Sequence, residues 1–371
     1  MSFNIGIGSN IRKSPYFDAT VLDGVSCFSV YNHMYIPAHF GDPIGEYKRL
    51  CEGVAMWDVS AQRQVEMAGP DAMKLVQHLT TRDISKTKIG QGRYVPLCDH
   101  AGNLINDPVL LKLSDNRFWI SIADSDMELW VKAIAAERKL NVEVFEPDVS
   151  PLAVQGPCAE DLIADLFGDW VRDIRYFWFR EIELDGIPLV LARSGWSKKG
   201  GFELYLTDGT RGGELWNIVK HAGAAYGIGP GAPNDVERVE SGLLSYGSDA
   251  RHIKMPANPF ELGLGKLVDL ESGVDFIGRA ALAKVKADGI KRYYTGFEIS
   301  GPAIKGSENQ HYLRRDGVNV GVITEMVYSS QLNKNIGIGL VDSDIGTDTS
   351  GLEVDMLGTT REVSIAKLPF I

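Results

Sequence analysis

Two carboxylates stand at positions where such side chains are uncommon, and each could do chemistry. Asp107 lies inside the apolar run "LINDPVLLKL", directly before Pro108. Aspartate is depleted in strands and proline removes a ladder donor, so one interpretation is a bulge or strand end where Asp107 caps a backbone N–H. The other interpretation is a buried acid that faces a ligand. The residues alone leave both open.

Glu203 is the second carboxylate, in the stretch "GGFELYL". The strict alternation of apolar residues predicts a strand over 201–206 with one face on a core. Glu203 and Tyr205 would share the opposite face, which meets either water or a ligand. The glycine pair that opens this stretch separates the strand from Trp196. Glycine often marks a place where a backbone passes close to a ligand.

Aromatic residues gather in the run "DWVRDIRYFWFREI" over 169–182. Most residues of this kind pack in hydrophobic cores. Electron-rich rings are also what a cationic onium ligand requires. The pattern is therefore compatible with a core or with an aromatic box, and the residues concerned are Trp170, Tyr176, Phe177, Trp178 and Phe179.

Motifs for several other chemistries are missing from the sequence. The seven histidines form no H-E-x-x-H and no cluster with carboxylates at ligand spacing, so we expect no metal site. There is no G-x-S-x-G and no phosphate loop, which disfavours a serine hydrolase and a nucleotide site. No two cysteines form a C-x-x-C pair, so we expect buried free thiols in a reducing cytoplasm. The cysteines are Cys27, Cys51, Cys98 and Cys158.

Length and charge narrow the class of protein. With 371 residues, the chain is long enough for two or three domains. A net charge of −11 argues against non-specific binding to nucleic acid and against docking on anionic lipid. The first residues do not form a signal-peptide pattern, and no run of about 18 apolar residues indicates a membrane span. We expect a cytoplasmic protein with small-molecule substrates.

One local pattern occurs twice along the chain. "VEMAGPDAMKLVQHL" (65–79) and "LAVQGPCAEDLIADL" (152–166) each predict a short strand, a tight Gly-Pro turn and a helix. A third strand and helix follow from position 201. Between the two copies, "RYVPLCD", "LINDPVLLKL" and "RFWISIA" predict a three-stranded meander. Together these units predict an α+β body.

Caps and stop signals predict three further helices, over 125–140, 233–247 and 276–289. Beyond the last of them, the sequence changes to short strands and turns, which indicates a small separate β-domain. The predicted domains are therefore 1–289 and 290–371.

Motifs spread over the whole chain resemble the folate-dependent aminomethyltransferase family, the T-protein of the glycine cleavage system and its relatives. They include "MWDVSAQRQVEMAGPDA" (56–72), "TTRDISKTKIGQGRYV" (80–95), "GGFELYL" (200–206) and "VERVESGLLSYGSD" (236–249). Each is weak alone, but their order and spacing are specific. The resemblance implies a three-lobed α+β fold around a central channel that binds tetrahydrofolate, with a small C-terminal β-barrel-like domain. It also suggests a homodimer.

The resemblance assigns residues to the folate. The family's pterin-contacting acid falls on Glu203, with Tyr205 beside it, and the paired acceptors of a carboxylate suit an amino-pyrimidine edge. The family's strand Asp falls on Asp107, although the preceding family Asp is Asn106 here. Asp107 would hydrogen-bond the reacting nitrogen or favour its developing positive charge. Arg238 matches the family's helix Arg and is a candidate for the anionic glutamyl tail.

The loop before the predicted strand departs from the family. "GWSKKGGFE" stands where "GYTGEDGFE" is usual, so Trp196 replaces a tyrosine, and the basic Lys198 and Lys199 replace acidic residues. This loop, the aromatic run and "WDVSAQRQVE" are similar to the dimethylsulfoniopropionate demethylase branch. That branch moves a methyl group from a sulfonium to tetrahydrofolate, giving 5-methyltetrahydrofolate and 3-(methylthio)propionate. For such a reaction we assign Trp196 and Tyr205 to the onium, with Trp170 and Tyr31 as weaker candidates.

Three alternatives stay open. The chain could be a true aminomethyltransferase of the glycine cleavage system, or a folate-dependent demethylase of another methylated amine or onium compound. A third class is a folate-binding or regulatory protein without chemistry, or a folate-using assembly factor for iron–sulfur clusters. The third class would require a reactive cysteine motif near the folate, and Cys98 lies in no such motif.

Overall fold

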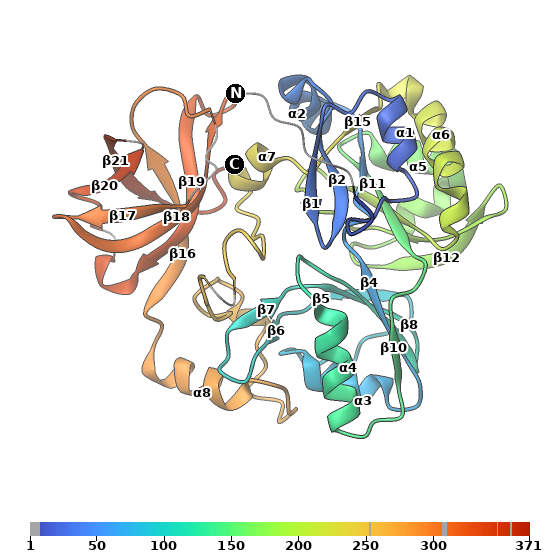
Figure 1. Cartoon of the computed structure of the whole chain (residues 1–371), viewed down its shortest axis with the longest axis horizontal. Coiled ribbons are helices and arrows are strands. Elements are labelled where there is room, and N and C mark those ends of the chain that lie inside the picture. Colours follow the sequence, from blue (N-terminus) through green and yellow to red (C-terminus); the bar gives the residue numbers. More distant parts are fainter. Residues whose placement is uncertain (1–7, 252–253, 306–309, 347, 357) are drawn as a thin grey trace. The chain divides into compact units, whose positions relative to one another are not determined.

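The protein is represented by a computed structural model, which describes residues 8–251, 254–305, 310–346, 348–356 and 358–371 (Figure 1). The chain forms two compact units, and each of them draws on separate stretches of sequence. The first unit comprises Met1–Met73, Thr87–Arg93 and Val109–Pro233, and the second comprises Lys74–Lys86, Tyr94–Pro108 and Asn234–Ile371. This division differs from the domains expected from the sequence, whose boundary at 289/290 stays a prediction.

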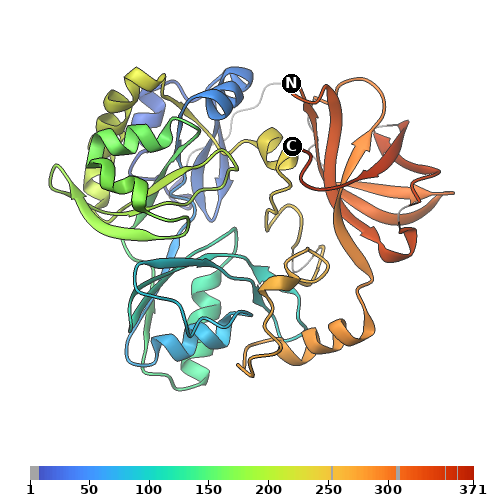
Figure 2. The same ribbon diagram turned by 180° about the vertical axis from the view of Figure 1, so that it is seen from behind.

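The first unit contains a six-stranded sheet in the order β12-β13-β14-β11-β3-β15. Neighbouring strands are antiparallel, except that β15 pairs in parallel with β3. The helices α5 and α6 each follow a strand of this sheet and cover one of its faces (Figure 2). Their bounds are β3 Ala55–Asp58, β11 Ser150–Gln155, α5 Ala159–Phe167, β12 Phe179–Leu184, β13 Ile187–Ala192, β14 Gly201–Leu206, α6 Gly212–Ala222 and β15 Gly229–Gly231.

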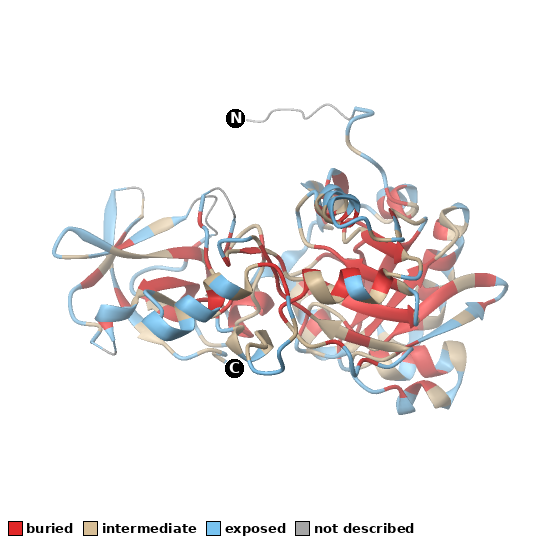
Figure 3. Cartoon of the chain, turned by 90° about the horizontal axis from the view of Figure 1, so that it is seen from below, coloured by how far each residue is buried: buried red, intermediate tan, exposed pale blue. Residues whose placement is uncertain are grey.

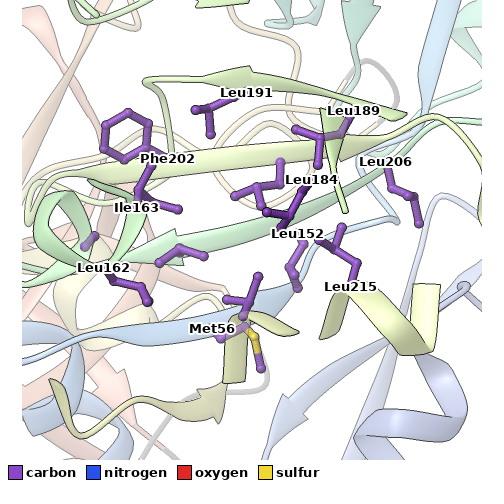
Figure 4. Packing of buried hydrophobic residues seen from close by; sticks show 14 of the residues in the cluster. Met56, Leu152, Leu162, Ile163, Leu184, Leu189, Leu191, Phe202, Leu206 and Leu215 are labelled. Atoms are coloured by element: carbon purple, nitrogen blue, oxygen red, sulfur yellow. The ribbon is translucent and has the colours of Figure 1, made fainter. Parts of the chain in front are cut away.

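The alternation predicted for β14 is confirmed. Phe202, Leu204 and Leu206 are buried in the cluster between the sheet and the helices, where they pack with residues such as Leu162 of α5 and Leu215 of α6 (Figure 4). Each buried side chain of this size stabilises the fold by about 1.5–3 kcal/mol. The strand–turn–helix units predicted from 152 and from 201 are therefore present, and one face of β14 is fixed by its apolar residues.

A five-stranded sheet, in the order β10-β4-β9-β8-β5, completes most of the first unit, with α4 beside it. A hairpin of β1 and β2 turns at Asn32 and His33, which both have positive φ. The bounds are α1 Phe17–Leu22, β1 Cys27–Tyr31, β2 Met34–His39, α2 Pro43–Glu52, β4 Gln64–Ala68, β5 Gln91–Tyr94, β8 Val109–Ser114, β9 Arg117–Ser121, α4 Met127–Glu137 and β10 Glu143–Phe145. The first predicted repeat is confirmed as β4 followed by α3 (Ala72–Leu79).

The predicted three-stranded meander is partly wrong, because its first two strands are each split. The first becomes β5 and β6 (Leu97–Cys98), and the second becomes β7 (Leu104–Asn106) and β8. Pro96 and Pro108 lie in the breaks and have no N–H to donate to a ladder. Asp107 therefore lies between two strands and not inside one.

The second unit ends in a closed six-stranded barrel, in the order β16-β19-β18-β17-β20-β21, drawn in orange and red in Figure 1. Phe297, Leu313 and Ile323 are fully buried in its interior. The change of character expected near position 290 is thus confirmed as a small C-terminal β-barrel. The strands are β16 Arg292–Ile299, β17 His311–Arg315, β18 Val318–Ser329, β19 Lys334–Asp342, β20 Leu352–Met356 and β21 Thr359–Ala366.

Two helices of the second unit are shorter than predicted. The helix expected over 233–247 is α7 (Asp235–Glu240), which ends because Gly242 takes a positive φ of 63°. The helix expected over 276–289 is α8 (Arg279–Asp288). Short 3-10 helices lie at η1 Asp169–Asp173, η2 Gly209–Arg211, η3 Gly223–Tyr226, η4 Gly265–Leu267 and η5 Ser343–Ile345.

Buried residues follow the strands of each unit (Figure 3). The expectation of four buried thiols is wrong: Cys98 is buried, but Cys51 and Cys158 are half-buried and Cys27 is exposed on the short hairpin strand β1. In the described part of the chain, no helix combines the length and the apolar character needed to cross a membrane.

Candidate functional site

Glu203 lies in the middle of β14, between Ala153 and Ala192 of the neighbouring strands. Only 4% of the residue is exposed, so the pattern-based option of a solvated face is excluded. Its Oε2 accepts hydrogen bonds from the hydroxyls of Ser194 and of Tyr205, the latter at 3.1 Å. Burial raises the pKa of Glu203, and these two hydrogen bonds act in the opposite direction. Its Oε1 accepts no hydrogen bond from the described residues.

The loop that leads into β14 is held by the amide of Gln155. The Nε2 of Gln155 donates to the carbonyls of Ser194 at 3.1 Å and Phe202 at 3.3 Å, and its Oε1 accepts from Ser197 Oγ at 2.8 Å. Gly195 and Gly201 have positive φ, and a Cβ on either would clash with the Gln155 amide. The glycines are thus required for this close packing, which fixes the hydroxyl of Ser194 beside Glu203.

The ring of Tyr205 is enclosed by protein. Its exposure is 1%, and it packs in a cluster between the two sheets with Leu111 and Trp119. The structure therefore uses the Tyr205 hydroxyl to hold Glu203. The predicted contact of the Tyr205 ring with a ligand stays a prediction, and it would require this cluster to open.

The aromatic run forms a tight turn before β12. Phe177 has a φ of 61°, which is strained for an aromatic residue. Two backbone hydrogen bonds hold this conformation: Phe177 N donates to the Arg193 carbonyl at 2.9 Å, and the Phe177 carbonyl accepts from Gly92 N at 2.6 Å. The neighbouring Tyr176 is 59% exposed, and its ring centroid lies 4.3 Å from that of Phe177. Partial burial and the charge of Glu203 raise the pKa of Tyr176. The sequence placed Tyr176 in a run compatible with a core or an aromatic box, but Tyr176 was not among the residues assigned to the onium.

The remaining predicted aromatic residues differ in their surroundings. Trp170, in η1, donates its indole N–H to the Phe167 carbonyl at 2.6 Å, and the Arg180 guanidinium lies 4.7 Å from its ring centroid. A cation of the protein itself therefore covers the Trp170 ring. Tyr31 is half-buried at the end of β1, and Trp196 is half-buried in the Gln155-held loop. Their contacts with an onium stay predictions.

Asp107 lies in the second unit, between β7 and β8, and is half-buried. The hydroxyl of Tyr94 donates to its Oδ2 at 2.7 Å. Burial raises the pKa of Asp107 to about 7, the Tyr94 hydrogen bond acts against this shift, and the charge of Asp249 adds to it. Tyr94 was not singled out from the sequence, although it belongs to the family-like stretch "GQGRYV".

Arg238 is buried among carboxylates, with 1% of its side chain exposed. Its guanidinium lies 2.8 Å from Asp249, 3.5 Å from Glu325 and 3.6 Å from Asp235. Burial lowers the pKa of Arg238, but the negative charges of Asp249, Asp235 and Glu325 outweigh this effect, and the pKa is raised overall. The predicted role of Arg238 as a partner for a glutamyl tail stays a prediction, because the guanidinium is already engaged by acids of its own unit.

The structure distributes the predicted residues over both units. Asp107 and Arg238 belong to the second unit, where the charge of Asp249 acts on both. In the first unit, Glu203 is joined to Tyr205, with the Trp196 loop beside them.

Two cavities of the first unit, of about 400 and 310 Å³, lie beside β12 and do not include Glu203 in their linings. The described residues bring together no group of three His, Cys, Asp or Glu side chains that could hold a metal ion.

Comparison with known proteins decides the family. Residues 17–272 match the model described as the GCVT N-terminal domain, and residues 292–371 match the glycine cleavage T-protein C-terminal barrel domain. The chain belongs to the glycine cleavage T-protein family. A solved structure of the same family, the glycine cleavage system aminomethyltransferase T of Bartonella henselae, superposes with a TM-score of 0.84 at 21% identity over 97% of this chain and 98% of that one. The expected α+β T-protein fold is thereby confirmed.

Curated members of the family are similar to this chain along its whole length. The dimethylsulfoniopropionate demethylase of Ruegeria pomeroyi is 41% identical over 355 residues, which is 96% of each chain. The aminomethyltransferase of Desulfitobacterium hafniense strain Y51 is 31% identical over 364 residues, covering 96% of this chain and 97% of its own. The expectation drawn from scattered motifs, that the resemblance extends over nearly the whole chain, is confirmed.

Proposed function

We propose that the protein is a tetrahydrofolate-dependent methyltransferase that demethylates dimethylsulfoniopropionate, giving 5-methyltetrahydrofolate and 3-(methylthio)propionate. The observation that carries the proposal is the 41% identity to a dimethylsulfoniopropionate demethylase over 96% of both chains. The identity to the aminomethyltransferase of Desulfitobacterium hafniense is lower, at 31% over a similar length. The family as a whole consists of folate-dependent transferases.

The surroundings of Glu203 fit a folate. Its Oε2 is engaged by Ser194 and Tyr205, whereas Oε1 accepts nothing from the described residues and so keeps its lone pairs for the N–H donors of a pterin. Bound tetrahydrofolate would supply the nitrogen, N5, that takes the methyl group. Because Ser194 and Tyr205 hold Oε2, and Gln155 holds the loop that carries Ser194, Glu203 orients the pterin with little loss of side-chain freedom.

A sulfonium requires little acid catalysis. When the bond from the methyl carbon to sulfur breaks, the electron pair stays on sulfur and the leaving group is a neutral thioether. The protein's task is to hold the two reactants in near-attack geometry and to contact the cation with aromatic faces. Tyr176, exposed beside the Glu203 segment, and Trp196, in the loop ahead of β14, are the rings we assign to this contact, with Tyr31 as a further candidate.

Asp107 completes the proposed chemistry in the second unit. Nitrogen that receives a methyl group carries a positive charge until it loses its proton. The carboxylate of Asp107 would accept that proton, and a pKa of about 7 suits a base that works near neutral pH. The Tyr94 hydrogen bond at 2.7 Å orients the accepting oxygen pair.

The test is a donor panel with the purified full-length chain and tetrahydrofolate. Dimethylsulfoniopropionate is expected to yield 5-methyltetrahydrofolate and 3-(methylthio)propionate in equal amounts, measured by chromatography. Activity with another methylated amine or onium, and none with this donor, would keep the reaction class and reject the substrate. Activity confined to an aminomethyl-lipoyl carrier protein would identify an aminomethyltransferase. Folate binding without turnover of any donor would support a non-catalytic role.

Trp196→Ala should raise the KM for the sulfonium and leave folate affinity unchanged.

A further inference from the structure

Gln155 is the last residue of β11, and its amide is buried, with an exposure of 1%. Nε2 donates to the carbonyls of Ser194 at 3.1 Å and of Phe202 at 3.3 Å. At the other end of the amide, Oε1 accepts from Ser197 Oγ at 2.8 Å. The amide therefore contacts the loop 195–200 in its middle and the chain on both sides of it.

The backbone at both ends of this loop packs directly on the Gln155 amide. A Cβ added at Gly195 would lie 2.1 Å from Gln155 Nε2, and one added at Gly201 would lie 2.6 Å from the same atom. Both glycines also have a positive φ, which residues with a Cβ rarely adopt. The course of the loop 195–200 therefore depends on the position of one side chain.

The segment held by Gln155 carries side chains that the proposed function assigns to two different reactants. Ser194 donates its hydroxyl to Glu203, which is assigned to the pterin, and the Ser194 carbonyl is bonded to Gln155 Nε2. Trp196, which is assigned to the onium, directly precedes Ser197, whose hydroxyl is bonded to Gln155 Oε1. The two ends of one amide thus support the two binding tasks.

We propose that Gln155 is a positioning residue for methyl transfer, which contacts neither reactant and places the Ser194–Glu203 pair for folate and Trp196 for the methyl donor through a single amide. The proposal rests on the proposed function for the assignment of Glu203 to the pterin and of Trp196 to the onium. The hold of the amide on the loop belongs to the protein without ligands. It can therefore be measured whether or not the methyl donor has been identified.

Gln155→Glu in the full-length protein is the most direct test. The side chain keeps its size, but an oxygen replaces the N–H donors and faces two carbonyls. The folate Kd and the KM for dimethylsulfoniopropionate should both rise by more than about tenfold. A rise in only one of the two constants would overturn the proposal.

Gln77→Glu is the matched control for a change of amide to carboxylate. Gln77 holds a loop of the second unit in a similar way, since Nε2 donates to the Arg82 carbonyl at 2.8 Å and Oε1 accepts from Ile84 N at 2.9 Å. This variant should lose stability, while the folate Kd and the donor KM stay within about twofold of the wild type. Equal changes in both constants in Gln77→Glu and Gln155→Glu would reduce Gln155 to a structural residue.

Two milder variants separate the ends of the amide and keep the proposal testable if Gln155→Glu fails to fold. Ser197→Ala removes the partner of Oε1 and should raise the donor KM by about three- to tenfold, with the folate Kd within about twofold. Ser194→Ala keeps its backbone carbonyl on Gln155 but loses the hydroxyl on Glu203, so it should raise the folate Kd by about three- to tenfold and the donor KM much less. A Ser197→Ala protein with an unchanged donor KM would contradict the proposal.

Trypsin provides a readout that needs no methyl donor, because the loop contains Lys198 and Lys199. Cleavage there requires the loop to open locally. Its rate, followed by mass spectrometry, should rise by about fivefold or more in Gln155→Glu and Ser197→Ala, and not in Gln77→Glu. An unchanged rate in Gln155→Glu would overturn the proposal. Faster cleavage with weaker folate binding, but no methyl transfer from any donor to tetrahydrofolate by the wild type, would overturn only the proposed function.

Discussion

Glu203 of the first unit and Asp107 of the second unit are the two acids to which the proposed function gives a role, and their surroundings differ. Both are carboxylates with a pKa raised by burial, and each accepts a hydrogen bond from a tyrosine, Tyr205 or Tyr94. Glu203 lies in the middle of a strand and is contacted by neutral hydroxyls. Asp107 lies in a break between strands, and the charge of Asp249 acts on it.

The different surroundings of Glu203 and Asp107 suit the two acids to different tasks, which are ligand recognition and proton transfer. A carboxylate fixed by a sheet and by neutral donors keeps one geometry and serves as an acceptor for a ligand's N–H groups. Burial, with a smaller contribution from the charge of Asp249, raises the pKa of Asp107 to about 7, so this carboxylate can exchange a proton near neutral pH. The proposed function uses the first acid to orient the pterin and the second to accept a proton.

The strongest test of this contrast is Asp107→Asn. The change removes the proton acceptor and keeps the size of the side chain, so kcat should fall by about 100-fold or more. The folate Kd should stay within about threefold, because recognition is assigned to Glu203. Methyl transfer by the wild type should decline below about pH 7 as Asp107 is protonated, and that decline should be missing from the residual activity of the variant. Stopped assays over a pH series measure both effects. A kcat close to that of the wild type would remove the proposed role.

Glu203→Gln tests the other side of the comparison. Loss of charge-assisted acceptors should raise the folate Kd by about 10- to 100-fold, with kcat at saturating folate changed much less. Titration calorimetry measures the binding. Glu181→Gln is the matched control, because Glu181 is an exposed carboxylate on β12 of the same sheet. If kcat fell as steeply as in Asp107→Asn while Kd stayed constant, the division between binding and proton transfer would be wrong.

Sequence reasoning found the two acids but not what surrounds them. Apolar and polar residues alternate along the sequence on both sides of Glu203. Because this pattern depends only on residues adjacent in sequence, strand β14 and its apolar face could be predicted. Whether the opposite face met water depended on Trp119 and Leu111 of another sheet, distant in sequence. The break at Asp107 was signalled by Pro108, yet Tyr94 and Asp249 reach the acid through tertiary structure. Arg238 matched a family motif, but its burial among three carboxylates is a property of the folded second unit.

The burial of Glu325, together with the charge of Asp235, predicts how stability depends on pH. The pKa of Glu325 is about 7 in the folded state and near 4.5 when unfolded, so the stabilisation present at low pH is lost as the pH rises through 7. Glu325→Gln carries no charge and avoids this loss. Its free energy of unfolding should exceed that of the wild type by about 1–3 kcal/mol at pH 8, and the difference should shrink towards pH 5.

Urea unfolding at several pH values measures this difference. Glu298→Gln is the control, because Glu298 lies on the barrel strand β16 but is partly exposed and paired with Lys334. Its effect should be small and nearly independent of pH. A Glu325→Gln protein that is less stable than the wild type at pH 8 would show that the Arg238 contact outweighs the like charges around it.

The smallest expected effect separates two aromatic residues of the first unit. Tyr176 presents an exposed ring near Glu203, whereas the Trp170 ring is already covered by the Arg180 guanidinium. Tyr176→Ala should therefore raise the KM for the sulfonium by about two- to fivefold, the range of one exposed cation–π contact, and Trp170→Ala should leave it within about twofold while lowering stability. Inhibition by the product 3-(methylthio)propionate, which keeps the carboxylate but has an uncharged sulfur, provides the charge control, since its binding should not respond to Tyr176→Ala. A larger KM effect from Trp170→Ala would mean that Arg180 leaves the ring when substrate binds, and that this tryptophan belongs to the onium site as the sequence predicted.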